Sequence, residues 1–151
     1  MLRSVALAAS ILLLAACSTT STVPQPPRLE SNQTYAYSFD NQGGDNHAAI
    51  ARLDNVIQSR LRAEGLVRTG EDNPRIEVVL RHFYVRSNAT RFWAGIMAGR
   101  DKIVSNIRVI GTDGSQIGNF DVETFNSTAW GSSEGLMERH AEEVVNRLKS
   151  A

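Results

Sequence analysis

The sequence predicts an α+β domain with a hairpin-rich, mostly antiparallel sheet and two helices packed on one face of that sheet. Three observations lead to this prediction. Two stretches repeat apolar residues at helical spacing, four stretches are rich in aromatic and β-branched residues, and an Asp-Gly pair joins two of those four. From residue 35 onward, the predicted order of elements is β-α-β-β-β-α.

The first strand and the first helix are predicted from alternation and from capping residues. Residues 35–39 alternate aromatic with small side chains, as a half-buried strand does. Asp45 or Asn46 can cap a following helix, and Gly65 can end it in the left-handed conformation. The apolar face of this helix is formed by Ile50, Leu53, Ile57 and Leu61.

The next strand is predicted at residues 75–86, which are rich in β-branched and aromatic side chains. Its apolar residues change face after Leu80, which indicates either a β-bulge or burial on both faces. Residues 102–112 and 116–126 are predicted to form a hairpin, because the Asp-Gly pair between them favours a tight turn.

A second helix closes the predicted domain. Ser132 or Ser133 can cap it, Glu134 lies near its start, and basic residues lie near its end, as the helix dipole favours. Its apolar stripe consists of Met137, Ala141, Val144 and Leu148.

Residues 1–16 have the composition of an export signal. A positive start is followed by an apolar run that is too short to span a bilayer as a helix. The run ends in Leu14, Ala15 and Ala16, directly before Cys17, the single cysteine of the chain. This ending resembles the bacterial lipobox.

The lipobox resemblance implies a lipoprotein. Cleavage before Cys17, a diacylglyceryl thioether on its sulfur and acylation of the new amino terminus would anchor the protein stably in a membrane. In the sorting pattern of such lipoproteins, Asp after the anchor retains the protein in the inner membrane. Ser18 at this place favours the outer membrane, with the protein facing the periplasm.

Three regions are therefore expected. Residues 1–16 are a signal peptide, and residues 35–151 are one periplasmic domain. Residues 17–34 between them comprise Cys17, whose lipidation the lipobox resemblance implies, and a stretch rich in Ser, Thr, Pro and Gln, which predicts a flexible tether.

Composition excludes several functional classes. The chain carries 16 basic and 16 acidic residues, which argues against a general nucleic-acid binder. One cysteine excludes a disulfide framework and a multi-cysteine metal site. We expect no cofactor and no metal. Basic residues concentrate at 75–108, where they either meet anionic envelope components or, as we favour, neutralise neighbouring acidic groups.

No catalytic site is predicted. Residues 131–135 match the G-x-S-x-G pattern of a hydrolase nucleophile elbow, but the only later histidine, His140, lies in the same predicted helix. A helix-capping serine is the simpler explanation. His47, His82 and His140 have no metal-binding spacing and are expected at the surface or half buried.

The uncharged segment 92–99, between two arginines, is the unusual feature of the chain. One interpretation is a loop that docks a partner, a lipid surface or an apolar ligand. The other, which we favour, is a connection between strands that folds over the core as a lid. The candidate docking residues are Arg91, Phe92, Trp93, Ile96, Met97 and Arg100.

The predicted pattern of residues 35–150 resembles small periplasmic lipoproteins that bear a domain of unknown function. It is also similar to the α/β domains of the curli-secretion lipoprotein CsgG and of the amino-terminal region of TolB. We therefore expect a non-enzymatic outer-membrane lipoprotein. Its membrane contact would be the anchor on Cys17, and its domain would act as an interaction or assembly module with an envelope protein partner. The alternative is a carrier or chaperone for a lipidic or apolar ligand.

Overall fold

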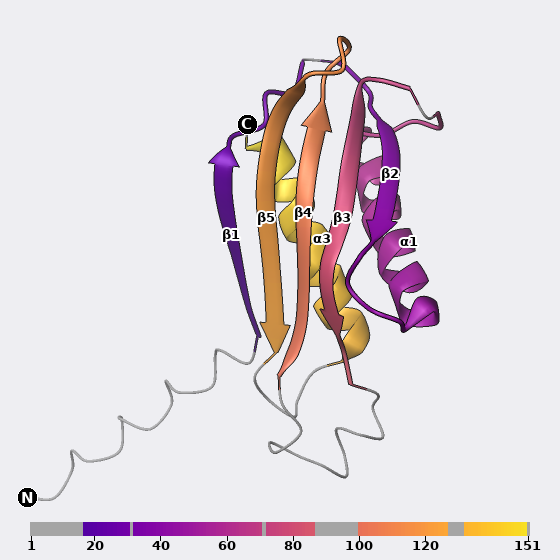
Figure 1. Cartoon of the computed structure of the whole chain (residues 1–151), viewed down its shortest axis with the longest axis vertical. Helices are drawn as coiled ribbons and strands as arrows, with labels where there is room; N and C mark the ends of the chain where they lie inside the picture. Colours follow the sequence, from indigo (N-terminus) through magenta and orange to yellow (C-terminus); the bar gives the residue numbers. More distant parts are fainter. Residues whose placement is uncertain (1–16, 31, 71, 87–99, 127–131, 151) are drawn as a thin grey trace, which may run out of the picture.

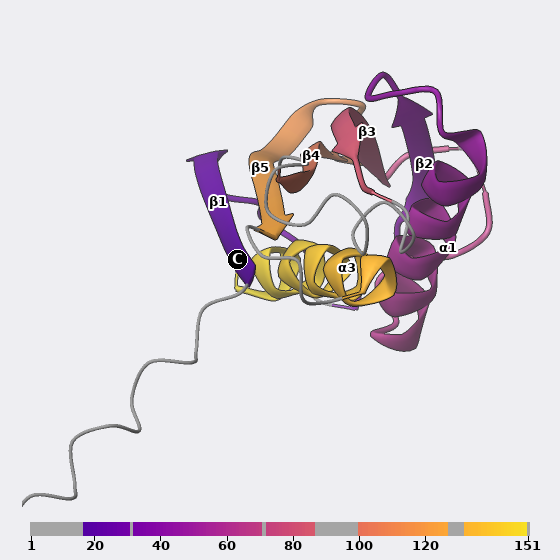
Figure 2. The same ribbon diagram turned by 90° about the horizontal axis from the view of Figure 1, so that it is seen from below.

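The computed structural model describes residues 17–30, 32–70, 72–86, 100–126 and 132–150. These residues form a five-stranded sheet with two helices on one of its faces, as Figures 1 and 2 show. The strands are β1 (Cys17–Gln25), β2 (Ala36–Asn41), β3 (Arg75–Tyr84), β4 (Asp101–Ile110) and β5 (Gln116–Asn126). The helices are α1 (His47–Ala63) and α3 (Ser133–Lys149).

The predicted α+β class is confirmed, and so is the order β-α-β-β-β-α from residue 35 onward. In space the strands follow the order β1-β5-β4-β3-β2. All neighbouring strands are antiparallel except β2 and β3, which are parallel because α1 connects them as a crossover. The parallel pair places α1 beside α3 on the same side of the sheet.

The caps of α1 lie where the sequence places them. The side chain of Asn46 accepts a hydrogen bond from the backbone N–H of Ala49 at 3.3 Å. At the other end, Gly65 has φ of 68°, and the N–H of Leu66 donates to the carbonyl of Leu61 at 2.9 Å. These bonds satisfy backbone groups that a helix terminus would otherwise leave without partners.

The change of apolar face in β3 is a β-bulge. Leu80 pairs with Ser105 and His82 with Val104, so Arg81 is the extra residue. The bulge turns Phe83 back toward the helices, and Phe83 is only 7% exposed. One strand can therefore bury both Leu80 and Phe83 on the same side.

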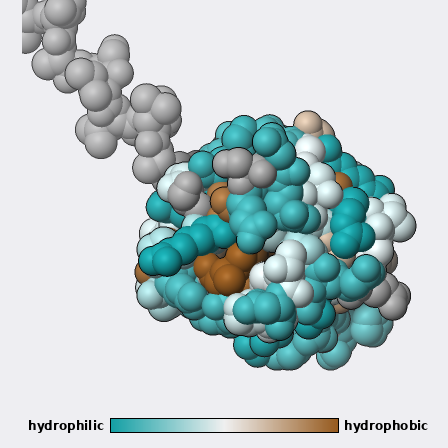
Figure 3. Space-filling view, turned by 90° about the horizontal axis from the view of Figure 1, so that it is seen from above, coloured by the Kyte–Doolittle hydropathy of each residue, from teal (hydrophilic) through white to brown (hydrophobic). Residues whose placement is uncertain are grey.

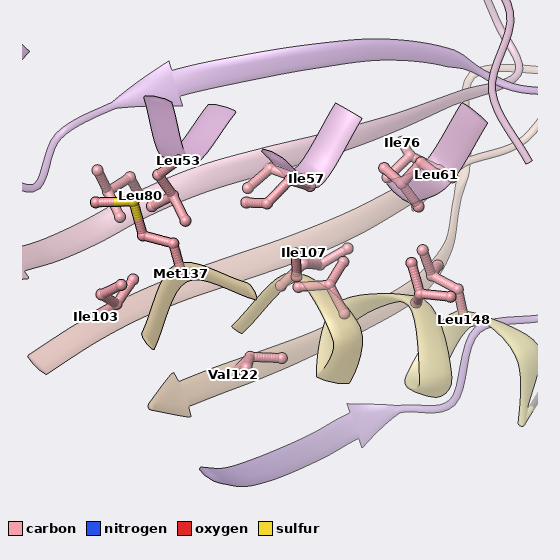
Figure 4. Close-up of a cluster of buried hydrophobic side chains, with 14 of the residues drawn as sticks. Leu53, Ile57, Leu61, Ile76, Leu80, Ile103, Ile107, Val122, Met137 and Leu148 are labelled. Carbon is pink, nitrogen blue, oxygen red and sulfur yellow. The ribbon is translucent and has the colours of Figure 1, made fainter. Parts of the chain in front are cut away.

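The core lies between the sheet and the helices (Figure 4). Both predicted helical stripes face it, and all of their residues are buried. From the sheet, alternate residues of β3, β4 and β5 meet them. Those labelled in the close-up are Ile76, Leu80, Ile103, Ile107 and Val122.

The expectation of a flexible tether over residues 17–34 is wrong. Residues 17–25 form β1, which pairs with β5 from Cys17 opposite Asn126 to Gln25 opposite Asn119. Low hydrophobicity favours disorder in an isolated segment, but the exposed edge of β5 offers backbone hydrogen bonds that composition does not reveal. Beyond β1, Pro27 is buried against Gly118, and Arg28 donates its N–H to Ile117 at 3.2 Å.

We expect Gly118→Ala to weaken this attachment. A Cβ atom at position 118 would lie 2.5 Å from the Cα atom of Pro27, so the chain after β1 would have to move. Overpacking of this kind typically costs about 1–3 kcal/mol, measurable as a lower urea midpoint. The exposed Thr22→Ala on β1 is the control and should change stability by no more than about 0.5 kcal/mol. Equal midpoints for both variants would contradict the packing of Pro27 on β5.

Candidate functional site: the end of the sheet at Cys17

Cys17, the predicted lipidation site, is the first residue of β1 and lies at the rim of the sheet. Its Cα atom is opposite that of Asn126, the last residue of β5. Asn126 in turn is opposite Asp101, the first residue of β4. The three residues form the terminal rung of the sheet, at the lower end of the molecule in Figure 1.

Five of the six candidate docking residues lie outside the described residues. They are Arg91, Phe92, Trp93, Ile96 and Met97. The sixth, Arg100, is described, is exposed and lies directly before β4. Its guanidinium carbon is 4.8 Å from the centre of the Phe125 ring, which is a cation–π arrangement. Arg100 therefore belongs to the same end of the sheet as Cys17.

A buried ion pair ties β3 to β4 at this end. Arg86 and Asp101 have side chains that are 2% and 0% exposed, and the Nε atom of Arg86 lies 2.9 Å from the Oδ1 atom of Asp101. The same oxygen accepts the backbone N–H of Arg86 at 2.9 Å. Removing one partner of such a pair leaves an uncompensated buried charge, so the pair fixes the geometry of the rim.

The other basic residues of the 75–108 stretch are partly neutralised across the open face of the sheet. Arg108 lies 2.9 Å from Glu77 on β3, and Lys102 lies 2.9 Å from Glu123 on β5. These contacts support the interpretation that neighbouring strands balance the charge. Because the groups are partly exposed, each pair adds little to stability.

A polar cluster lies inside the core beneath the rim. The imidazole of His140, on α3, is within 3.0 Å of the Thr124 hydroxyl through Nδ1 and within 2.9 Å of the Ser105 hydroxyl through Nε2. All three residues are fully buried. Thr19 of β1 donates to Thr124 at 3.4 Å, so the cluster reaches the edge strand.

The prediction that His140 is at the surface or half buried is wrong. It lies three residues after Met137 and four before Val144, within the apolar stripe of α3. This spacing is the signal that could have placed it in the core. Its hydroxyl partners come from β4 and β5 and carry no signature in the sequence.

The hydrolase pattern is not assembled. Ser132 caps α3, accepting the backbone N–H of Gly135 at 3.0 Å. Ser133 donates to the carbonyl oxygen of Arg86 at 3.4 Å. His140 instead contacts Ser105 and Thr124, where solvent and substrate have no access.

The described residues contain no group of three metal-binding side chains placed to hold an ion. Among the same residues, no helix is both long and apolar enough to cross a membrane. An open hollow of about 380 Å³ lies between α1 and α3. Its rim is charged, with Arg60 2.9 Å from Glu138.

Comparison with known proteins identifies the family. Residues 25–129, more than half of the chain, match a family described as "Domain of unknown function (DUF4410)". The chain belongs to the DUF4410 family. No curated protein matches it.

Solved structures share the fold of this DUF4410 domain. Two structures of a PelC dodecamer from Paraburkholderia phytofirmans, one of them a single-substitution variant, superpose with TM-scores of 0.60 and 0.59. They are 14% and 11% identical in sequence, and each match covers 87% of this chain and 97% of the PelC chain. At this level of identity the likeness concerns the fold alone.

We expect the DUF4410 domain to lose stability in acid through His140. Burial lowers the pKa of His140 to about 3 from its ordinary value of 6.5, because desolvation disfavours the charged ring. Between these values the unfolded chain binds a proton that the folded chain does not. Above pH 6.5 the ring is neutral in both states, so the stability that depends on a neutral His140 is fully present. As the pH falls from 6.5 toward 3, the free energy of unfolding declines by about 1.4 kcal/mol per pH unit.

Urea denaturation at several pH values measures this effect. His140→Gln removes the titrating ring and should flatten the acid slope relative to the unmodified protein. Ser105→Ala is the matched control, because it lowers stability but leaves the imidazole buried, so its slope should remain. An unchanged slope in His140→Gln would show that another group governs acid sensitivity.

Proposed function

We propose that this protein is a lipid-anchored outer-membrane lipoprotein whose periplasmic domain is a non-enzymatic interaction or assembly module of the cell envelope. One observation carries the proposal. Cys17 both follows a stretch that resembles a lipobox and begins a strand of the folded domain. The predicted acylation site and the domain are therefore one continuous structure, which suits a module that works at the membrane.

The chemistry of the described residues supports a non-enzymatic function. The arrangement closest to a nucleophile and base, Ser105 with His140, is fully buried. A reacting side chain must contact its substrate, and this hydroxyl cannot do so without unfolding of the core. The cluster is better explained as a satisfied polar network that joins α3 to the sheet.

Assembly is supported by the form of the sheet. Among the described residues, β1 and β2 are its two edges, and each has a neighbouring strand on one side only. Edge strands present backbone groups that can bind another chain. The PelC structures that share this fold are described as dodecamers, so a chain with this fold can form a homo-oligomer.

The described residues favour the interaction module over the carrier hypothesis. The space between sheet and helices is filled by the buried core. The hollow between α1 and α3 is open, and it is lined by charged residues such as Arg60 and Glu138 as well as by Val56 and Ala63, so it does not form an enclosed apolar pocket.

We expect Cys17→Ala to abolish lipid attachment. Without the sulfur there is no thioether, so the chain should stay unprocessed or leave the membrane fraction. Labelled palmitate incorporation and membrane fractionation measure this result. Ser18→Asp is the matched variant: it should keep the palmitate label but move the protein to the inner membrane on a density gradient. Palmitate in the Cys17→Ala protein would overturn the lipoprotein proposal.

Co-purification in a native detergent tests the interaction function. If residues 92–99 dock a partner, changing Trp93 and Ile96 to Ser should remove the co-purified protein while stability changes by less than about 1 kcal/mol. A control changes the exposed Asn55 and Arg62 of α1 to Ser and should keep the partner. Destabilisation on the order of 3–5 kcal/mol would instead show that the segment covers the core.

A further inference from the structure

The length of chain between the anchor and the folded domain limits how the domain can lie at the membrane. Cys17 is itself the first residue of β1, so no spacer separates the acylated residue from the sheet. One residue spans at most about 3.6 Å, so Ser18 and the terminal rung must stay close to the lipid headgroups once Cys17 is acylated. A flexible tether would have allowed any orientation, whereas a strand does not.

Strand pairing and a buried ion pair hold the described residues of the rim around Cys17. Seven residue pairs between Cys17–Asn126 and Gln25–Asn119 hold β1 against β5. The buried pair of Arg86 and Asp101 then joins β3 to β4 at the same level. A force on the anchor is therefore transmitted to the whole sheet, and the domain should not pivot freely about its first residue.

Side chains at this end suit a lipid–water interface. Tyr84 is 45% exposed, and among the described residues it is the one large hydrophobic side chain that is exposed. It pairs with Lys102, one position beyond the terminal rung residue Asp101. Arg100 is exposed at the same rim. Tyr and Arg are typical of membrane interfaces, because their apolar parts pack at the headgroup level while their polar ends stay hydrated.

The opposite end has a different surface. It carries the turn between β4 and β5, where Thr112, Asp113 and Ser115 are all exposed. Figure 3 shows that this end is mainly hydrophilic and that its hydrophobic area lies in a recess behind hydrophilic groups. A flat lipid surface cannot reach into such a recess. β4 has ten residues, so the two ends are separated by roughly 30 Å.

We infer that the domain stands on the membrane by the end of the sheet that contains Cys17, with Ser18, Tyr84 and Arg100 at the phospholipid headgroups and the Thr112–Ser115 turn directed into the periplasm. This orientation rests on the proposed lipid anchor. It places the free edges of β1 and β2 roughly perpendicular to the membrane plane, where neighbouring molecules in the same membrane can reach them.

Site-specific fluorescence tests the orientation. Acylation consumes the only native cysteine, so Arg100→Cys and Thr112→Cys each provide one free thiol for a fluorophore. The acylated full-length protein is reconstituted in vesicles of phosphatidylethanolamine and phosphatidylglycerol with a headgroup nitroxide lipid. Because a ~30 Å separation exceeds the contact range of a nitroxide, the label at position 100 should be quenched at least about fivefold more than that at 112.

A spacer variant is the control. Ten Gly/Ser residues inserted between Cys17 and Ser18 keep the anchor and the strand but extend the link by about 17 Å, so quenching at position 100 should fall. Equal quenching at both positions in acylated protein, or stronger quenching at 112, would overturn the orientation alone. If mass spectrometry finds Cys17 unacylated in membranes, the proposed function fails, and this orientation fails with it.

Discussion

Burial of one face of the sheet beneath α1 and α3 is the interaction on which the rest of the structure depends. Ile107, at the centre of β4, and Phe120, opposite it on β5, are fully buried beneath the helices. Each such side chain contributes about 1.5–3 kcal/mol when it leaves water. Ion pairs then join α1 to α3 at the surface, but they are exposed and add little. The apolar layer therefore sets the positions of both helices.

Two groups of buried polar side chains among the described residues lie toward one end of this layer. The His140 cluster and the Arg86–Asp101 pair lie near the rim that contains Cys17. Buried polar groups are tolerated when their hydrogen-bonding partners are present, and they favour one arrangement over others because any shift leaves them without partners. We interpret them as fixing the register of α3, β3, β4 and β5 at the end of the sheet that contains Cys17.

The edge strand β1 differs from the other strands in how it is held. Its sequence is rich in Ser and Thr and provides little apolar surface, with Val23 packing only partly against the core. Backbone hydrogen bonds to β5 and the contact of Pro27 with Gly118 hold it instead. The proposed anchor on Cys17 would therefore give the domain a defined position at a membrane, which a disordered tether would not do.

The sequence alone determined the elements whose signals are local. The stripes of α1 and α3, the caps at Asn46 and Ser132 and the Asp-Gly hairpin depend on residues a few positions apart, and each lies where it was predicted. Apolar periodicity also predicted that β3 has either a bulge or burial on both faces after Leu80, and the structure shows the bulge. The resemblance to a lipobox at Cys17 is equally local, and it supports a proposal.

Only the tertiary structure decided which distant groups meet. β1 is a strand because the edge of β5 lies free to receive it, about a hundred residues away in the chain. Ser105 and Thr124 contact His140 because β4, β5 and α3 pack together. Arg86 and Asp101 form an ion pair because β3 and β4 are neighbours in the sheet. Such partners are brought together by burial and register, which depend on the whole fold rather than on any short stretch of sequence.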